Sequence, residues 1–460
     1  MSLSLVLEDT GFGLRAAVVE EDRLVELLDA DVDAGGVTER LFLARVTSVD
    51  KGLGAAFLDV GLAEPGFLAA KDARAAKGAV ERRPIQELVA EGDRLIVQGL
   101  RESVGDKGPR FTADPKLLGM ALIYQPFAGP RDVSRPGKRD AEAVRQRVEQ
   151  LFPEGGMMAR RFAADLGDAA LLAEGQALQE RWKRLRAAAD ATKRPGPLVD
   201  GETPLARLLQ HLPEPPERIV VGDGPLAIEL KRLMAERPVL RKVAVERLPP
   251  GVRVFVETGV DNEIEAALGE EVPLPGGGRI LIQPTAACVA IDVDGGGRGA
   301  LATNLAAAAE VGRQLRLRNL GGTVVIDFID LPAKGERQRV EDALRKALRQ
   351  DPLPVQVYPM SPLGLVELSR ARRGEPLAAR FRRTCPTCDG NGSVPSLRAS
   401  AEALLGELGS ARTPPREVRV ASDLAGFLEP SPAWERTRSR LGPLALTVDP
   451  TLAPGGYRLA

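Results

Sequence analysis

Residues 303–330 read TNLAAAAEVGRQLRLRNLGGTVVIDFID, and this stretch decides the fold class. Thr303 or Asn304 suits the start of a helix, and apolar residues then recur at helical spacing over Leu305–Arg318. Two glycines end that pattern, and a run rich in β-branched residues follows over Thr323–Ile329. The stretch therefore predicts a helix that leads directly into a buried strand.

The same alternation extends to both sides of this stretch. Further strands are predicted over Arg279–Pro284, Ala287–Val293 and Val355–Tyr358, with a helix over Glu336–Arg349. Because apolar strands alternate with helices, we expect an α/β core whose sheet is covered on both faces.

The rest of the chain is divided by composition. Short strands separated by turn residues predict a β-meander over the first 35 residues and a small closed barrel from about Glu39 to Thr112. Residues 138–192 have helical spacing, and Lys193–Pro216, with six prolines, is predicted to be a connection. Beyond it the predicted elements are strand Arg218–Val221, helix Pro225–Ala235, strands Val239–Val245 and Val252–Val256, and helix Asn262–Leu268. The last 60 residues show a weak pattern and are assigned to a small appended module.

Composition narrows the possible chemistry. The chain has 460 residues with 44% apolar residues and a net charge of −1, so it can build several cores and has no global basic field. Three cysteines, no signal-like N-terminus and no long apolar stretch predict a cytoplasmic protein without a membrane span. His211 is the one histidine, so histidine-pair catalysis is nearly excluded and a hydrolase would use carboxylates and a metal.

Paired aspartates end two of the predicted core strands. Asp292 and Asp294 lie in AACVAIDVDGGG, and Asp327 and Asp330 in TVVIDFID. Side chains two apart on a strand share a face, and ligand sites gather at the carboxyl ends of strands in α/β sheets. Carboxylates at such an edge suit Mg²⁺, but aspartate also ends strands simply as a turn residue, so both interpretations stay open.

Arginine-rich segments accompany these strands. Bidentate guanidinium groups suit phosphates, although any single arginine could equally lie on a solvated helix face. The arginines selected as candidate RNA contacts in or near these segments are Arg298, Arg316, Arg318, Arg370 and Arg372.

Two further patterns suggest binding. Cys385 and Cys388 lie in FRRTCPTCDGNG, which is half of a zinc knuckle. Structural zinc takes four ligands, so a zinc ion shared by two chains is the economical solution and implies a dimer. Two reduced cysteines in a loop are the alternative. In AAFLDVGLAEPGF, Phe57 and Phe67 could stack on bases or belong to the barrel core, with the cations Lys107 and Arg110 nearby.

Together these motifs resemble the catalytic half of the ribonuclease E/G family. The resemblance rests on residues 303–330, on SPLGLVELSRARR at 361–373, on the cysteine motif and on the barrel motif, and it covers about residues 1–392. It implies a ribonuclease-H-like subdomain (1–36 and 216–278) around an OB-fold barrel (37–116) and a 5′-sensor-like helical region (117–215), then a DNase-I-like catalytic subdomain (279–380) and a zinc link (381–395). The C-terminal module (396–460) lies outside the resemblance.

The resemblance also implies site residues and a reaction. Asp292 and Asp327 correspond to the magnesium ligands, with Asp294 as a possible third, Cys385 and Cys388 to the zinc ligands, and Phe57 and Phe67 to the RNA-stacking pair. The implied reaction hydrolyses single-stranded RNA to 5′-phosphate and 3′-hydroxyl ends.

The chain departs from the family pattern at three places. Asp294-Gly295 replaces an Asn-Ser pair, the loop before Thr303 is shorter, and the sensing Arg-Thr pair reads Arg160-Arg161, of which Arg160 is a candidate RNA contact. A non-catalytic RNA-binding paralogue, dimeric through a shared zinc, is therefore the alternative hypothesis. A third hypothesis, an α/β phosphotransferase, has less support because the sequence contains no GxxxxGK[ST] loop.

Overall fold

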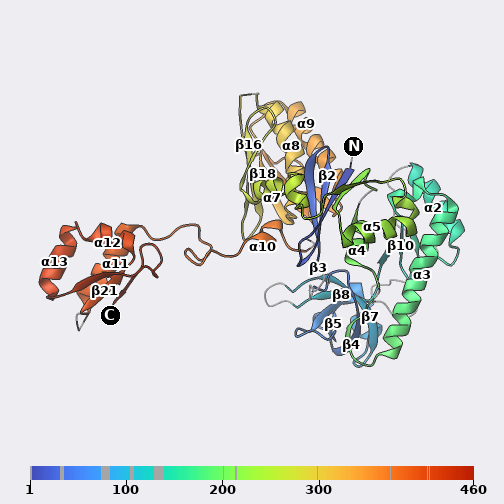
Figure 1. Cartoon of the computed structure of the whole chain (residues 1–460), viewed down its shortest axis with the longest axis horizontal. Coiled ribbons are helices and arrows are strands. Elements are labelled where there is room, and N and C mark those ends of the chain that lie inside the picture. Colours follow the sequence, from blue (N-terminus) through green and yellow to red (C-terminus); the bar gives the residue numbers. More distant parts are fainter. Residues whose placement is uncertain are drawn as a thin grey trace. The chain divides into compact units, whose positions relative to one another are not determined.

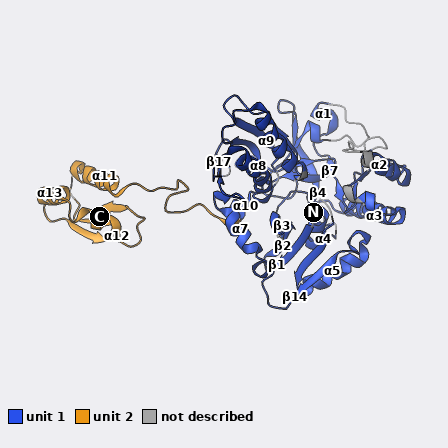
Figure 2. Ribbon diagram, turned by 90° about the horizontal axis from the view of Figure 1, so that it is seen from above, with its two compact units in different colours: residues 1–380 blue, residues 381–460 orange. Residues whose placement is uncertain are grey.

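A computed structural model of the chain describes residues 3–31, 36–73, 83–103, 108–128, 139–199, 201–212, 215–297, 299–372, 374–411, 413 and 415–459. The chain forms two compact units, Met1–Arg380 and Phe381–Ala460 (Figures 1 and 2). None of the helices in the described ranges has the length and apolar character needed to cross a bilayer.

The first sheet of the larger unit combines two distant parts of the chain. Its strand order is β14-β13-β1-β2-β3, in which β1 pairs parallel with β13 and antiparallel with β2. The N-terminal meander thus pairs with a strand that follows the barrel and the helical region. The bounds are β1 Leu3–Asp9, β2 Gly13–Glu20, β3 Arg23–Asp31, β13 Arg218–Gly222 and β14 Ala244–Leu248, and the accompanying helices are α5 Pro225–Glu236, α6 Val254–Glu257 and α7 Val260–Leu268.

The second sheet is the predicted barrel. Its strand order is β12-β4-β5-β6-β8-β7, and a further pairing of β4 with β7 closes five of these strands, consistent with an OB-fold. Phe42, Leu58 and Phe111 fill its core. The bounds are β4 Leu41–Asp50, β5 Ala55–Asp59, β6 Gly66–Ala69, α1 Ile85–Leu88, β7 Arg94–Arg101, β8 Arg110–Thr112 and β12 Gly196–Pro197.

A helical region follows the barrel and shares the core of the first sheet. Trp182 and Leu185 of the long helix α3 pack in one cluster with Leu5 and Leu7 of β1. The elements are β9 Leu117–Leu118, β10 Leu122–Tyr124, α2 Arg139–Leu151, β11 Met157–Ala159, α3 Asp168–Ala191 and α4 Pro204–His211.

The third sheet contains the aspartate strands. It is called the catalytic sheet because it lies in the segment that the resemblance assigns to a catalytic subdomain. Its order is β15-β16-β17-β18-β20-β19, with β17 and β18 parallel. Side chains of α8 and α9 form one apolar cluster with the inward residues of the sheet, and Figure 1 shows both helices beside β16 and β18. The bounds are β15 Glu271–Pro273, β16 Arg279–Pro284, β17 Val289–Asp294, α8 Ala300–Leu317, β18 Gly322–Asp327, α9 Lys334–Ala347, β19 Val355–Val357, β20 Leu365–Arg370 and α10 Leu377–Phe381.

The smaller unit has its own core. Leu404, Val418 and Trp434 are among the buried residues that join its helices to a sheet of order β22-β21-β23. The elements are α11 Leu397–Ser410, β21 Glu417–Val420, α12 Ser422–Leu428, α13 Pro432–Leu441, β22 Ala445–Val448 and β23 Tyr457–Leu459.

Four expectations about the fold were wrong. Val252–Val256 was predicted as a strand, but it contains the short helix α6. Val239–Val245 mostly forms a 3-10 helix and a turn before β14 begins at Ala244. The proline-rich connection contains helix α4, whose Leu205 and Leu209 are fully buried. The catalytic sheet was predicted to be covered on both faces, yet the face opposite α8 and α9 carries exposed carboxylates.

Candidate active site

Asp292 and Asp327 lie next to each other on the catalytic sheet. They are register partners at the ends of the parallel strands β17 and β18. Their neighbours Ile291 and Ile326 are buried against the helices, whereas both aspartates are exposed on the opposite face. Adjacent strands are about 4.8 Å apart, so the two carboxylates can converge on one point in front of the sheet.

The third carboxylate of this region is already paired. Asp294 lies on the same face as Asp292, and its Oδ2 accepts a hydrogen bond from Nε of Arg279 at 2.9 Å. Arg279 also contacts Glu271 at 3.0 Å, and the hydrogen bonds to Asp294 and Glu271 raise the pKa of its guanidinium. Asp294 is therefore held by a cation of the neighbouring strand.

Asn304 fixes the loop that follows Asp327. Its side chain is fully buried, its amide nitrogen donates to the carbonyl of Ile329 at 2.7 Å, and its oxygen accepts from the Ile329 N–H at 3.1 Å. The sequence suggested Asn304 as a helix cap, but α8 begins earlier, at Ala300, after Gly299. A buried amide in this position was missed because its partner lies in another element.

Glycines bring two loops together beside the aspartates. A Cβ on Gly296 would lie 1.8 Å from the backbone nitrogen of Gly278, and a Cβ on Gly278 would lie 2.6 Å from the carbonyl oxygen of Asp294. The loop after β17 can pack against the turn between β15 and β16 only because these positions have no side chain.

Asp330 lies outside this arrangement. It follows the end of β18 and lines a cavity of about 520 Å³ at the N-terminal ends of α8 and α9, together with Gly299 and Arg339. Of the four predicted aspartates, two are therefore paired in register, one is held by an arginine, and one belongs to a neighbouring cavity.

The two exposed carboxylates suit a hard divalent cation. Among the described residues, no group of three or more His, Cys, Asp or Glu side chains is arranged to hold a metal. Mg²⁺ needs fewer protein ligands than that, because it usually takes one or two carboxylates and fills its remaining positions with water and substrate phosphate. Asp292 and Asp327, neither of which has an ion pair to a described residue, supply such a pair.

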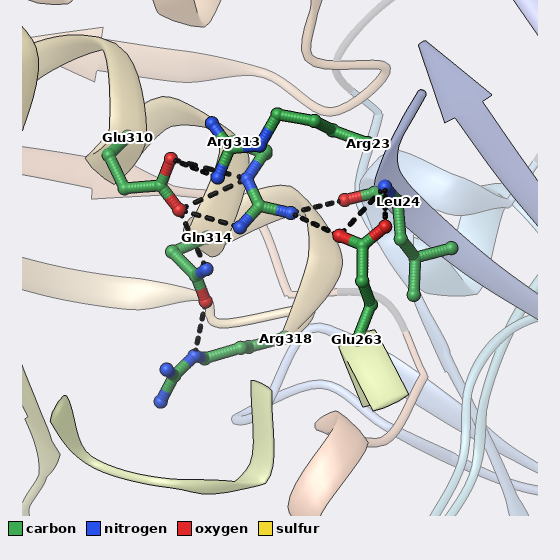
Figure 3. Close-up of polar contacts among 7 residues, drawn as sticks. All are labelled: Arg23, Leu24, Glu263, Glu310, Arg313, Gln314 and Arg318. Carbon is green, nitrogen blue, oxygen red and sulfur yellow. Dashed lines mark hydrogen bonds and ion pairs between the residues drawn. The ribbon is translucent and has the colours of Figure 1, made fainter. Parts of the chain in front are cut away.

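The arginines of α8 are engaged inside the protein. Figure 3 shows Arg313 between Glu310 of its own helix and the start of β3, where its Nη1 donates to the Leu24 carbonyl at 2.6 Å. Glu263 of α7 accepts from the Leu24 N–H at 3.0 Å and from Arg313 at 3.3 Å. Burial alone would raise the pKa of Glu310, but Arg313, Gln314 and Arg23 outweigh it and lower the pKa.

Three of the arginines predicted to contact RNA are, like Arg313, bonded to other parts of the fold. Arg316 is 6% exposed and pairs with Glu20 and Glu26 of the first sheet, each at 2.8 Å. Arg318 donates to Gln314 and to the Gly269 carbonyl, both at 2.6 Å. Arg370 is 3% exposed and forms a bidentate pair with Asp351. These buried guanidinium groups join elements of the fold, so we leave them out of the proposed RNA contacts.

The remaining predicted cations differ in placement. Arg372 is exposed and donates to the Gly321 carbonyl at 3.2 Å. Arg160 donates to backbone carbonyls of Gly119 at 2.7 Å and Leu212 at 2.9 Å, and burial lowers its pKa. Lys107 and Arg298 lie outside the described residues, as does the side chain of Arg161.

The histidine beside Arg160 is uncharged near neutral pH. Burial, reinforced by the positive charge of Arg160, lowers the pKa of His211 to about 4. Its Nε2 lies 2.7 Å from Oε2 of Glu39, so a neutral imidazole can donate to that carboxylate. It comes from α4 and not from the catalytic sheet.

The barrel carries a pair of aromatic rings on its outer side. Phe57 and Phe67 are register partners on β5 and β6, with ring centroids 6.0 Å apart and an edge-to-face angle of 78°. They are half-buried, whereas the alternate residues Ala56, Leu58 and Leu68 fill the core. Arg110, the register partner of Phe67, is paired with Asp72 at 2.5 Å. This placement favours a surface role for both rings.

The cysteine pair lies in the smaller unit. Backbone N–H groups of Cys388 and Thr387 donate to the Cys385 sulfur and lower the pKa of its thiol. Such bonds favour the thiolate that zinc requires. Cys288, the other cysteine, is half-buried next to Thr285 in the larger unit.

Comparison with known proteins agrees with this architecture. The pattern of the Ribonuclease E/G family matches residues 116–373. Ribonuclease G of Escherichia coli is 31% identical over 433 residues, which cover 89% of this chain and 88% of that protein. Ribonuclease E of Nostoc sp. is 31% identical over 84% of this chain but only 58% of that protein. Ribonuclease E of Escherichia coli is 32% identical over 83% of this chain, which spans 38% of that protein. The chain belongs to the ribonuclease E/G family.

Proposed function

We propose that this chain is a magnesium-dependent endoribonuclease of the cytoplasm that hydrolyses single-stranded RNA to 5′-phosphate and 3′-hydroxyl ends. The observation that carries the proposal is the pair of exposed carboxylates, Asp292 and Asp327, in register at the ends of two parallel strands. Relatives of similar length are named ribonuclease G, which supports RNA as the substrate.

Each part of the proposed site has a defined task. Asp292 and Asp327 hold the cation in front of the catalytic sheet, and Asn304 and the close glycine contacts keep the two strand ends in place. A bound Mg²⁺ would activate water and neutralise charge on the scissile phosphodiester. Phe57 and Phe67 stack on unpaired bases, because their rings lie on the outer side of the barrel.

The smaller unit supports the proposed dimer. Cys385 and Cys388 supply two thiolates, and a structural zinc takes four ligands. Two chains that each contribute this pair complete one zinc site, so the active protein is a homodimer or a larger homo-oligomer.

The test compares cleavage of a 5′-monophosphorylated single-stranded RNA by the native chain, Asp292→Asn and Asp327→Asn. We expect each variant to lose at least about a hundredfold in rate, since a metal supplies several kcal/mol to the transition state. RNA affinity measured without magnesium should change little. Asp190→Asn, an exposed acid at the end of α3, is the matched control and should cut normally.

The alternative is an RNA-binding paralogue without turnover. It is favoured by the departures from the family pattern beside the site, namely the shorter loop before Thr303 and an Asp294 that is paired with Arg279. If the native chain binds RNA yet does not cut it at any magnesium concentration, the hydrolytic proposal fails and this alternative replaces it.

A further inference from the structure

The open face of the catalytic sheet extends beyond the two aspartates. Next to Asp327 the register places Leu365 of β20, and two residues further along β20 is Glu367. Glu367 is exposed on the same face as Asp327, because Val366 and Leu368 point to the helices and are buried. One further carboxylate therefore lies one strand away from the proposed metal site.

Tyr358 lies opposite Glu367 on this face. It directly follows β19, and its N–H donates to the Glu367 carbonyl at 2.9 Å, which continues the antiparallel ladder. Val355 and Val357 pack toward the helix-covered core, so the alternation directs Tyr358 to the open face. The tyrosine is 42% exposed, so its ring is open to solvent on this face.

The separation from the proposed metal site suits a neighbouring nucleotide. Tyr358 lies two strands away from Asp327 across the sheet and is offset from it by two residues along the strand direction. At ordinary strand spacing, their Cα atoms are therefore about 12 Å apart. A base near a phosphate held at the aspartates can reach the tyrosine ring without crossing a covered part of the sheet.

We propose that Tyr358 and Glu367 form a base-binding subsite on the catalytic sheet, a conclusion that rests on the proposed RNA substrate. The ring stacks on an unpaired base, as exposed aromatic residues do in single-strand binding. The carboxylate accepts a hydrogen bond from an exocyclic amino group, as Glu does from cytosine N4. Uracil has no exocyclic amino group, and its one donor on this edge, N3–H, lies between two carbonyl oxygens that repel the carboxylate. Uracil is therefore disfavoured, and the subsite takes adenine, cytosine or guanine.

A fluorescence experiment tests the stack without requiring cleavage. 2-Aminopurine, whose emission is quenched by stacking, is placed at successive positions of a short single-stranded RNA and titrated with protein in buffer lacking magnesium. Quenching at one position should be lost in Tyr358→Ala and kept in Tyr358→Phe. The control Phe12→Ala removes another exposed ring, on the β1–β2 turn of a different sheet, and should keep it. A quenching pattern that is the same in Tyr358→Ala and in the native chain overturns the proposal.

Cleavage then tests the base preference. With the base at the quenched position varied, we expect Tyr358→Ala to raise KM by roughly tenfold with kcat nearly unchanged. Glu367→Gln should remove a roughly tenfold preference over uridine. Thermal unfolding of each variant shows that the fold is retained.

The two proposals can fail separately. Quenching that depends on Tyr358 without any cleavage upholds the subsite and overturns hydrolysis. Cleavage without a Tyr358-dependent quenching signal upholds hydrolysis and overturns the subsite. Absence of RNA binding by the native chain overturns both.

Discussion

At the scale of single residues, His211 gives the chain a defined sensitivity to acid. Its pKa is about 4 in the folded protein and 6.5 in an unfolded chain, so the unfolded state binds more protons between these values. The free energy of unfolding should therefore fall as the pH is lowered from about 6.5 to 4, by about 1 to 3 kcal/mol. Urea unfolding at several pH values measures this. His211→Gln should lack that part of the pH dependence, and an unchanged profile would contradict the assignment.

Asn304 offers a second test at this scale. Asn304→Ala leaves the part-buried N–H and carbonyl of Ile329 without their partners, which should cost about 1 to 3 kcal/mol of stability. Because Ile329 follows Asp327, RNA cleavage should also slow. The exposed Gln338→Ala on α9 serves as the control and should change neither the melting temperature nor the rate. Equal behaviour of the two variants would show that the amide does not position the loop.

The sequence predicted the placement of the carboxylate pair better than it predicted the roles of the arginines. Asp292 and Asp327 could be placed together because strand alternation and strand ends are local properties of the sequence. The role of Arg316 could not be predicted in this way, since its partners Glu20 and Glu26 lie far earlier in the chain. A guanidinium suits a phosphate and a buried carboxylate equally well, so only the fold distinguishes the two roles.

At the scale of elements, the contact between α8 and α9 depends on Gly312. A Cβ there would lie 2.8 Å from the Cβ of Ala347 and 3.3 Å from its carbonyl carbon. Gly312→Ala should therefore lower the melting temperature, even though alanine favours a helix by about 1 kcal/mol. Gly335→Ala in α9 has open space around its Cβ and should raise it. Calorimetry of both variants provides the comparison, and stabilisation by both would refute tight packing.

Long elements were predicted well and short ones were not. Helices α3, α8 and α9 have enough turns for an apolar period to show in the sequence. Helix α6 spans only Val254–Glu257, whose β-branched residues favour a strand locally. It is helical because Val254 and Phe255 are buried and Glu8 of β1 accepts the Phe255 N–H at 3.1 Å. Such distant contacts leave no local pattern.

At the scale of the whole molecule, the cysteine pair predicts a measurable stoichiometry. Metal analysis of the purified protein should find one zinc for every two chains, because each chain supplies two of the four thiolates. Cys385→Ser with Cys388→Ser should remove the zinc and shift the protein to monomers in sedimentation experiments. Cys288→Ser is the matched control and should change neither property. One zinc per chain, or a dimer that survives the double substitution, would contradict a shared site.

The pairing of β1 with β13 has a consequence for biosynthesis. The N-terminal meander is synthesised before the barrel, but its parallel neighbour begins only at Arg218. The barrel strands β4 to β8 are synthesised between them and pair with one another over short sequence distances. Domains generally fold as units during synthesis, and contacts distant in sequence form slowly. The barrel should thus be completed while β1 still exposes an unpaired edge, so the nascent meander can pair with strands of other chains until Arg218–Gly222 has been synthesised.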